Sequence, residues 1–222
     1  MSNGVTFESI ESVTVDGVKI NSSKYNCTAA VGQAGGKWAL TIDDLKAIEG
    51  VDLTDGAEVV VIYNAHLNEN AKVNKESGNT ENKNGVYLEY SNNPNVGGEG
   101  SRGKTPEDFV WVFTYGVDNT KVNEKEEPFA GAGFRLYKGE NEVKLIKDNE
   151  LDAYRPVKGE EVGEEMFSAS GTGKFNIVGL DAGTYTLLET TTPSGYNTCE
   201  PITVIISATH TENKEGTDAT TD

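Results

Sequence analysis

The sequence contains few of the residues that most often bind metals or form crosslinks. Only two cysteines and two histidines occur among its 222 residues. Cys27 and Cys199 are far apart and neither belongs to a CxxC pair, which excludes a disulfide framework and a thiolate zinc site. His66 and His210 have no second ligand at metal-binding spacing. We therefore expect two unpaired, partly buried thiols, no metal and no cofactor.

Long apolar runs and basic residues are also scarce. No stretch approaches the roughly 20 apolar residues of a membrane helix. The 19 Lys and Arg residues are outnumbered by 36 Asp and Glu residues, so the net charge is −17. Nucleic acids and anionic membranes repel such a polyanion, and we expect neither as a partner. No signal-peptide pattern opens the chain and a polar tail ends it, so we expect both ends to lie inside a longer protein.

The residues that are present follow the pattern of an all-β protein. Short β-branched runs are separated by Gly, Asn and Asp, and Gly alone accounts for 25 residues. Asp16-Gly17 lies between two apolar runs and predicts a hairpin turn. Residues 58–67 alternate as one strand does, and residues 86–90 predict another. The exception is the segment 41–48, where apolar residues share one helical face before Gly50, and we expect one short helix there.

Residues 92–107 carry glycines and prolines with almost nothing apolar, which is typical of a linker. We therefore predict a first β-sandwich over residues 1–95, a linker over 96–107 and a second β-sandwich over 108–222. The second half reads as at least six strands separated by turn signals, as in an immunoglobulin-like sandwich.

Two formal matches to catalytic patterns carry little weight. Residues 98–103 (GEGSRG) satisfy GxGxxG, but a Thr-Pro pair and a strand follow, where the dinucleotide fingerprint requires a helix. No Gly-x-Ser-x-Gly elbow occurs, and neither cysteine neighbours a histidine in sequence. We expect no enzyme with turnover.

One carboxylate lies where an apolar residue would be expected. In the strand beginning near Tyr185, a period of two residues places Tyr185, Leu187 and Glu189 on the same face. A Glu on a core face is costly unless it is neutral or paired. The alternative is that the strand ends there and Glu189 reaches solvent.

Several motifs resemble one family. Residues 185–196 (YTLLETTTPSGY) resemble the E-box, Y-x-L-x-E-T-x-A-P-x-G-Y, with Thr192 in the usual Ala position. Residues 118–123 (DNTKVN) and 128–136 (PFAGAGFRL) resemble the opening of the same Cna-B-type domains. In the first half, residues 63–68 (YNAHLN) and 86–94 (VYLEYSNNP) resemble the preceding domain of a pilin. The chain thus resembles the SpaA-type backbone pilins of Gram-positive, sortase-assembled pili, over nearly its whole length.

The resemblance implies a self-crosslinking chemistry. In that family a Lys on the first strand of a domain and an Asn on its last strand form an intramolecular amide, which a nearby acid promotes. Carried over, Lys121 is the amine and Glu189 the promoter, with burial lowering the Lys pKa and raising that of the acid. The strand that carries the acceptor in the family would follow residue 222, so we expect that the second domain lacks its last strand and that its crosslink cannot close within these residues; Asn213 is the one late acceptor candidate. In the first domain Asn84 matches the acceptor best and Asn82 is second, although both could equally be solvated loop residues.

The resemblance also implies a function and partners. We expect a structural subunit of a fibre attached to the cell wall, joined covalently to other pilin subunits by a sortase and able to reach a host surface or extracellular matrix. The stalk of a surface adhesin is an alternative, and a carbohydrate-binding sandwich is a less favoured one. The latter should group exposed aromatics on one face, whereas Trp38 and Trp111 lie in different predicted domains.

Overall fold

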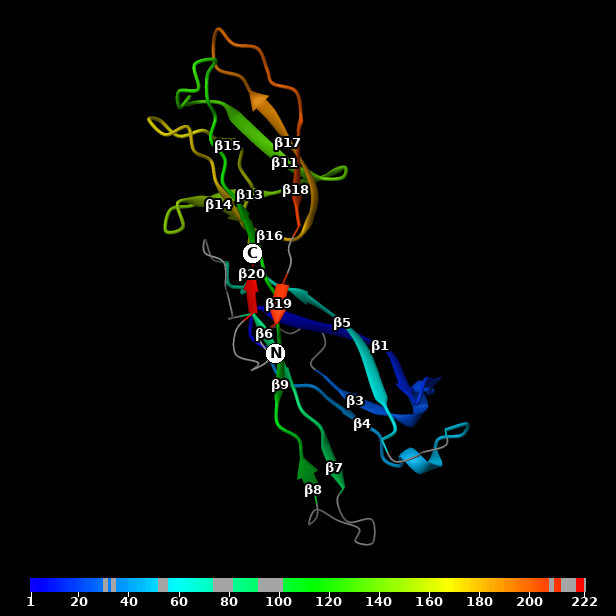
Figure 1. The fold of residues 1–222 in the computed structure, drawn as a ribbon. Coiled ribbons are helices and arrows are strands. Elements are labelled where there is room, and N and C mark those ends of the chain that lie inside the picture. The colour runs from blue at the N-terminus through cyan, green and yellow to red at the C-terminus, as the bar shows by residue number, and fades with distance from the viewer. Residues whose placement is uncertain are drawn as a thin grey trace. The chain divides into compact units, whose positions relative to one another are not determined.

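The computed structural model describes residues 1–29, 32, 35–51, 56–73, 82–91, 102–207, 210–212 and 219–221. These residues form β-strands and two 3-10 helices of three residues each, which confirms the all-β prediction. None of the described helices is long and apolar enough to cross a membrane. The chain divides into two units (Figure 1), of which unit 1 comprises Met1–Ala71 and Asn82–Val110, and unit 2 comprises Lys72–Glu81 and Trp111–Asp222.

Unit 1 is built on two long antiparallel strands, β1 and β5 (Figure 1). They pair from Val5 with Leu67 to Val15 with Val59, with two register shifts in between. Val13 and Val15 on β1 are fully buried and pack with Ile20 and Ile48 into the core of this unit. The strands of unit 1 are β1 (Val5–Val15), β2 (Val18–Lys19), β3 (Asn26–Thr28), β4 (Ala39–Thr41), β5 (Val59–Leu67), β6 (Lys83–Val86), β7 (Glu89–Ser91), β8 (Arg102–Lys104) and β9 (Asp108–Trp111).

The turn predicted at Asp16-Gly17 is confirmed. It joins β1 to β2, and both residues have positive φ, 47° for Asp16 and 78° for Gly17. Positive φ at both central positions is the requirement of a type I′ turn, which Asp-Gly satisfies at little cost. The Asp16 carboxylate also accepts a hydrogen bond from the Glu58 backbone N–H at 2.7 Å, which ties the turn to the start of β5.

The helix predicted over residues 41–48 is wrong in extent. Thr41 is the last residue of β4 and pairs with Asn26 on β3. A single 3-10 turn, Leu45–Ala47, forms instead, with Asp44 as its cap. A second 3-10 turn, Ser22–Lys24, was not predicted; the Asn21 side chain caps it by accepting from the Ser23 backbone N–H.

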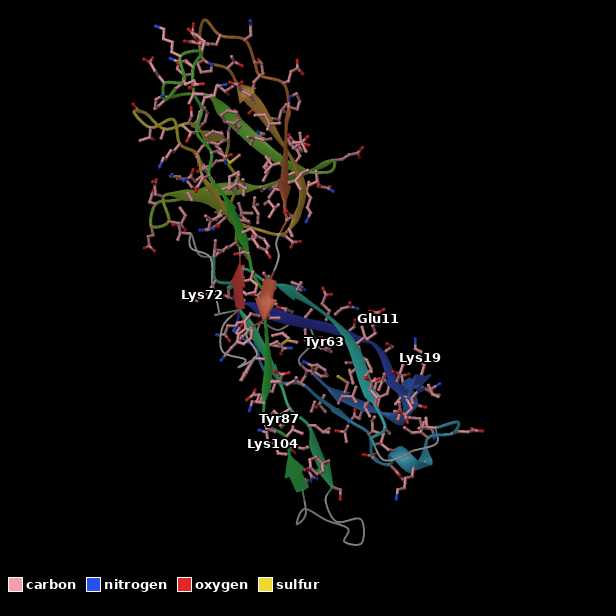
Figure 2. The ribbon with its side chains drawn as sticks, viewed as in Figure 1. Glu11, Lys19, Tyr63, Lys72, Tyr87 and Lys104 are labelled. Atoms are coloured by element: carbon pink, nitrogen blue, oxygen red, sulfur yellow. The ribbon has the colours of Figure 1, made fainter. Side chains whose placement is uncertain are left out.

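A two-stranded ribbon forms the end of unit 1. β6 pairs with β9, and β7 pairs with β8. The predicted strand 86–90 is therefore divided between β6 and β7, and part of the predicted linker, Arg102–Lys104, is strand β8. Lys104 lies over the Tyr87 ring, with its Nζ 3.4 Å from the centroid (Figure 2). The predicted domain boundaries stay a prediction.

Unit 2 contains two larger sheets that enclose its core. One has the order β10-β16-β14-β13, and the other has the order β12-β11-β17-β18 with β15 added beside β11. The core includes Phe134 on β11 and Phe175, whose rings stack with centroids 4.3 Å apart. The strands of unit 2 are β10 (Tyr115–Val117), β11 (Gly133–Lys138), β12 (Asn141–Val143), β13 (Leu145–Asp148), β14 (Ala153–Pro156), β15 (Met166–Phe167), β16 (Ile177–Leu180), β17 (Gly183–Thr191), β18 (Ile202–Ile206), β19 (His210–Glu212) and β20 (Ala219–Thr221).

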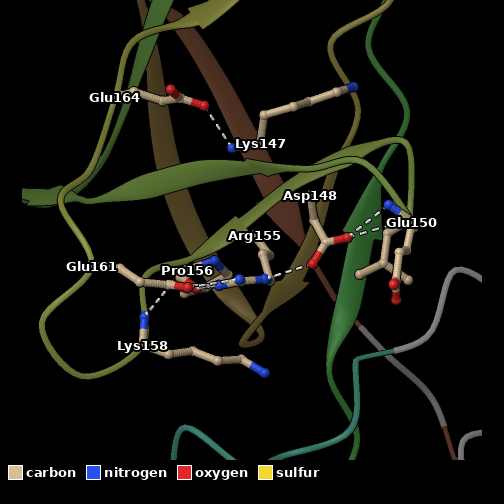
Figure 3. Close-up of polar contacts among 9 residues, drawn as sticks. Lys147, Asp148, Glu150, Arg155, Pro156, Lys158, Glu161 and Glu164 are labelled. Atoms are coloured by element: carbon tan, nitrogen blue, oxygen red, sulfur yellow. Dashed lines mark hydrogen bonds and ion pairs between the residues drawn. The ribbon is translucent and has the colours of Figure 1, made fainter.

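Arg155 on β14 holds the loop that follows it through ion pairs and hydrogen bonds (Figure 3). Its guanidinium donates to Asp148 on β13 at 2.8 Å and to both carboxylate oxygens of Glu161 at 2.7 and 2.9 Å. Glu161 also accepts from the Lys158 backbone N–H at 2.7 Å. These hydrogen bonds, that of Arg155 first, lower the pKa of Glu161 to about 2. The loop therefore stays ion-paired over the whole physiological pH range.

Candidate functional site: a buried acid and an amine

Lys121 follows β10 in a segment that its own backbone hydrogen bonds hold in place. Its N–H donates to the Gly173 carbonyl at 2.9 Å, and its carbonyl accepts from the Phe129 N–H at 2.8 Å. Isolated β-bridges flank it on both sides, Thr120 with Lys174 and Val122 with Pro128. The segment thus runs between two neighbouring stretches of chain, and this fixes the direction in which the lysine side chain leaves the backbone.

Glu189 lies near the end of β17, on the face that points into the core. Along β17 the buried residues are Tyr185, Leu187 and Glu189, and the residues between them are more exposed. The Glu189 side chain is only 1% exposed. The alternation predicted for this strand is therefore confirmed, and the alternative in which Glu189 reaches solvent is wrong.

The two side chains meet. Lys121 Nζ lies 3.4 Å from Glu189 Oε2, and the Lys121 side chain is 21% exposed. The same ammonium lies 5.9 Å from the centroid of the Phe134 ring. Oε2 also accepts a hydrogen bond from the Cys199 backbone N–H at 2.8 Å. Oε1 is buried and has no hydrogen-bond partner among the described residues. One carboxylate oxygen is thus occupied and the other is free.

The electrostatics of the pair differ from the prediction that burial would raise the carboxyl pKa. Burial is the largest single influence on Glu189 and it does raise its pKa. Hydrogen bonds from the Cys199 backbone and thiol, together with the charge and hydrogen bond of Lys121, oppose it. The resulting pKa of Glu189 is lowered, because the donors around Oε2 stabilise the anion. Before any reaction, the pair is therefore an ion pair.

Gly173 is the residue that allows the Lys121 segment to approach so closely. A Cβ added to Gly173 would lie 2.3 Å from the Lys121 carbonyl oxygen, and its φ is +65°. We expect Gly173→Ala to lower the free energy of unfolding by about 2–4 kcal/mol, since backbone strain and a backbone clash add together.

Gly171→Ala is the matched control for this prediction. Gly171 has a φ of +77° but nothing within 4 Å of its added Cβ. Gly171→Ala should therefore lower the free energy of unfolding by only about 1 kcal/mol, from backbone strain alone. Urea denaturation of both variants measures the difference, and equal losses would contradict the role given to Gly173.

The acceptor candidates have different surroundings. Asn213 lies outside the described residues. In unit 1 both Asn84, on β6, and Asn82 are buried, so the alternative of solvated loop residues is wrong. The Asn84 side-chain amide donates to the hydroxyl of Tyr63 (labelled in Figure 2), whose ring centroid lies 5.0 Å from that of Trp38. Within the described part of the chain, no asparagine is hydrogen-bonded to the Glu189 carboxylate.

The remaining candidates are His66 and the two cysteines, which make contacts typical of structural residues. His66 lies on β5 at the surface, as predicted, and its Nδ1 is 2.8 Å from Glu8 Oε1. The described residues contain no group of acidic, His or Cys side chains that could hold a metal ion. Both cysteines are free and partly buried, as predicted. The contact of Cys199 with Glu189 was not predicted, and the only sequence signal for it is its position shortly after the E-box-like motif.

One strand next to the candidate site has an unpaired edge within the described part of the chain. β18, which follows Cys199, pairs only with β17 and ends its sheet. A strand edge of this kind presents backbone N–H and C=O groups that a further strand can bind.

Comparison with known proteins agrees with this architecture. Residues 116–220 match the family model described as the SpaA prealbumin-like fold domain. No curated protein matches the chain. Among solved structures, a variant of BcpA, the major pilin subunit of Bacillus cereus, is 18% identical with a TM-score of 0.54 over 93% of this chain. The group B streptococcus pilus 2b backbone protein is 23% identical with a TM-score of 0.53, covering 98% of this chain and 78% of that one.

These identities are low, so the likeness to solved structures establishes the fold. The chain covers 54% of the BcpA variant, about half its length. Residues 116–220 match the model of the SpaA prealbumin-like fold domain, and the chain as a whole shares its fold with the BcpA variant and the group B streptococcus pilus 2b backbone protein.

Proposed function

We propose that this chain is part of the shaft subunit of a cell-surface pilus and that Lys121 forms an intramolecular amide crosslink with an asparagine, a reaction promoted by Glu189. Its two units correspond to two tandem immunoglobulin-like sandwiches, the second of Cna-B type. The observation that carries the proposal is the buried carboxylate of Glu189, which binds Lys121 through one oxygen and has no partner for the other oxygen among the described residues. An unpaired buried polar atom is costly, which favours a further group bound there in the finished protein.

The ion pair can begin the reaction by itself. A proton passes from the Lys121 ammonium to the Glu189 carboxylate, which leaves a neutral amine and a neutral acid. The amine attacks the side-chain carbonyl carbon of the asparagine while the acid donates a hydrogen bond to its oxygen. The new N–C bond forms, the original C–NH₂ bond breaks, and ammonia leaves with the proton that the amine loses. Each domain reacts once, so the chemistry is self-modification without turnover.

The acceptor would come from a further strand that runs past Lys121 and brings an asparagine to Oε1 of Glu189. Asn213 is the candidate within this chain. In unit 1, Asn84 is the candidate for a separate crosslink with a lysine that is still to be identified.

A covalent tie between strands suits a fibre under tension. It prevents the strands from separating when the subunit is pulled, and with only Cys27 and Cys199 available no disulfide framework can do so. We place the protein outside the cell in a wall-attached pilus, joined by a sortase to other pilin subunits. The assembled fibre would reach host surfaces or extracellular matrix.

Intact mass spectrometry of the protein expressed from its complete gene tests the crosslink. The wild type should be lighter than its sequence by one ammonia for each amide. The loss assigned to unit 2 should disappear in Lys121→Ala and in Glu189→Gln. Lys174→Ala is the control, since Lys174 is an exposed lysine on the neighbouring segment and should leave the mass loss intact. A wild-type protein of unmodified mass would overturn the proposal.

A further inference from the structure

The loop that joins β17 to β18, residues 192–201, turns back toward the strand that it leaves. At its tip the Tyr196 backbone N–H donates to the Pro193 carbonyl at 3.2 Å, and Gly195 between them has a φ of +87°. A residue with positive φ at the third position is the requirement of a type II turn, and glycine meets it at little cost. Tyr196 ends both this turn and the E-box-like motif that contains Glu189.

The two arms of the β17–β18 loop are joined below the turn. The hydroxyl groups of Thr192 and Thr198 are hydrogen-bonded, with their oxygens 2.7 Å apart. The next residue, Cys199, donates its backbone N–H to Glu189 Oε2 at 2.8 Å. This donor belongs to the main chain, so the path of the loop places it at the carboxylate whatever side chain stands at position 199.

The tip of the loop is attached to the other half of the site. The Tyr196 ring lies with its centroid 4.5 Å from that of Phe129, at an interplanar angle of 52°. This is a favourable arrangement for two aromatic rings. The Phe129 backbone N–H in turn donates to the Lys121 carbonyl at 2.8 Å. One loop therefore contacts the amine's segment through Tyr196 and the acid through Cys199.

The contacts of Glu189 are divided unevenly between its two oxygens. Oε2 accepts from the Cys199 backbone and lies 3.4 Å from Lys121 Nζ. Oε1 is buried without a partner among the described residues. A carboxylate held by Lys121 alone could rotate about its last bond and exchange the two oxygens. A second donor fixed at Oε2 opposes this rotation.

We propose that the β17–β18 loop holds the two partners of the ion pair together, with Tyr196 as its positioning residue. The Tyr196 ring packs on Phe129 and so keeps the Cys199 N–H at Oε2 of the acid. Oε1 then stays available to the acceptor asparagine. The inference rests on the proposed function, and Tyr196 neither forms nor breaks a bond in the reaction.

Hydrogen exchange of the Cys199 backbone amide in the 222-residue chain tests the inference, because that N–H is the donor to Glu189. NMR of the ¹⁵N-labelled chain follows the exchange of each amide. We expect Tyr196→Ala to accelerate the exchange of the Cys199 amide roughly three- to tenfold, the factor that corresponds to the loss of one aromatic pair. Amides paired between β11 and β17 should keep their exchange rates, which distinguishes an opened loop from an unfolded unit.

Two further variants separate the ring contact from a general loss of apolar surface. Tyr196→Phe keeps the ring, and its Cys199 amide should exchange at the wild-type rate. Phe167→Ala is the matched control, since Phe167 and Tyr196 are both 44% exposed but Phe167 lies on β15. Phe167→Ala should leave the exchange of the Cys199 amide unchanged. Equal acceleration in Tyr196→Ala and Phe167→Ala would overturn the role given to Tyr196.

Thr198→Val tests the join between the two arms and does not depend on Tyr196. Valine keeps the shape of the side chain and removes the hydroxyl group that bonds to Thr192. We expect the Cys199 amide to exchange roughly two- to fivefold faster, because one neutral hydrogen bond is lost. Ser194→Ala removes an exposed hydroxyl group from the same loop and should have no effect.

The complete protein links the loop to the crosslink. Mass spectrometry after cell-free synthesis follows the loss of ammonia with time. We expect this loss to be roughly three- to tenfold slower in Tyr196→Ala and unchanged in Tyr196→Phe.

The outcomes separate the inference from the proposed function. An unchanged exchange of the Cys199 amide in Tyr196→Ala would overturn the inference and leave the crosslink standing. Faster exchange with an unchanged rate of ammonia loss would also overturn the positioning role. If the exchange is faster but even the wild-type protein loses no ammonia, the loop contact exists and the proposed crosslink does not.

Discussion

Replacing Phe134 with alanine should cost unit 2 about 3–5 kcal/mol of its free energy of unfolding, the range for large-to-small changes at a buried aromatic. Phe134 is 2% exposed and its ring stacks on Phe175 with an interplanar angle of 1°. Removing it leaves a cavity at the centre of the core and one face of Phe175 without a partner. Denaturant unfolding followed by circular dichroism measures the loss.

Phe167→Ala is the control for this prediction. Phe167 lies on β15, which pairs with the β11 strand that carries Phe134, but its side chain is 44% exposed. Its replacement should cost less than about 1 kcal/mol, since little apolar surface returns to water. Similar losses at Phe134 and Phe167 would show that the Phe134–Phe175 stack is not the core of this unit.

Phe134 also connects the core to the candidate site. Its ring centroid lies 5.9 Å from Lys121 Nζ, and Phe134 pairs with Glu189 across β11 and β17. The core residue and the acid are thus opposite each other on neighbouring strands. A cavity at Phe134 should therefore let water reach the pair as well as destabilise the fold.

Local patterns in the sequence were sufficient to predict features that depend only on neighbouring residues in the chain. The alternation of Tyr185, Leu187 and Glu189 follows from the two-residue period of any strand, and it placed the acid on the core face before any partner strand was known. The Asp16-Gly17 turn was predictable for the same reason, since two adjacent residues with positive φ define it. These features depend on a few consecutive residues.

Features that depend on distant residues were not predictable in this way. Residues 41–48 have a helical apolar pattern, but Thr41 is drawn into a strand by its pairing with Asn26. The contribution of Gly173 becomes visible only when the Lys121 backbone lies against it. The contact of Cys199 with Glu189 likewise requires the segment after β17 to fold back onto the strand.

The contact between Lys121 and Glu189 was predictable only in part. Its segment carries no alternation that points to an acid 68 residues later in the sequence. The family resemblance supplied this pairing, and the structure brings the two side chains into contact. The lowered pKa of Glu189 could not be predicted from the resemblance, because it depends on the donors around Oε2 as well as on burial.

Replacing Lys121 with methionine should destabilise unit 2 and change how its stability depends on pH. The variant keeps most of the side-chain volume but leaves the Glu189 carboxylate buried without its counter-ion. We expect a loss of about 2–4 kcal/mol near neutral pH, at or below the range for fully buried pairs, because part of Lys121 reaches water. Chemical unfolding at a series of pH values, in the 222-residue chain, measures the effect.

The sign of the pH dependence follows from the Glu189 pKa. In the wild type this pKa is lowered, so the ionised group contributes stability above its unfolded-state pKa, and this stability is lost as the pH falls through the folded-state pKa. In Lys121→Met the folded-state pKa rises, because the nearby positive charge is gone. The stability difference between the two proteins should therefore be largest near neutral pH and should narrow on acidification, as Glu189 becomes protonated in both.

The double variant Lys121→Met/Glu189→Gln completes a thermodynamic cycle for this pair. It has neither charge, so it should recover much of the stability that Lys121→Met loses and should show little dependence on pH between the two Glu189 pKa values. A coupling free energy near zero would mean that the contact of 3.4 Å contributes nothing in solution. A stability difference that stays constant on acidification would contradict the ion pair, because Glu189 would then bind the same number of protons in both folded proteins across this pH range.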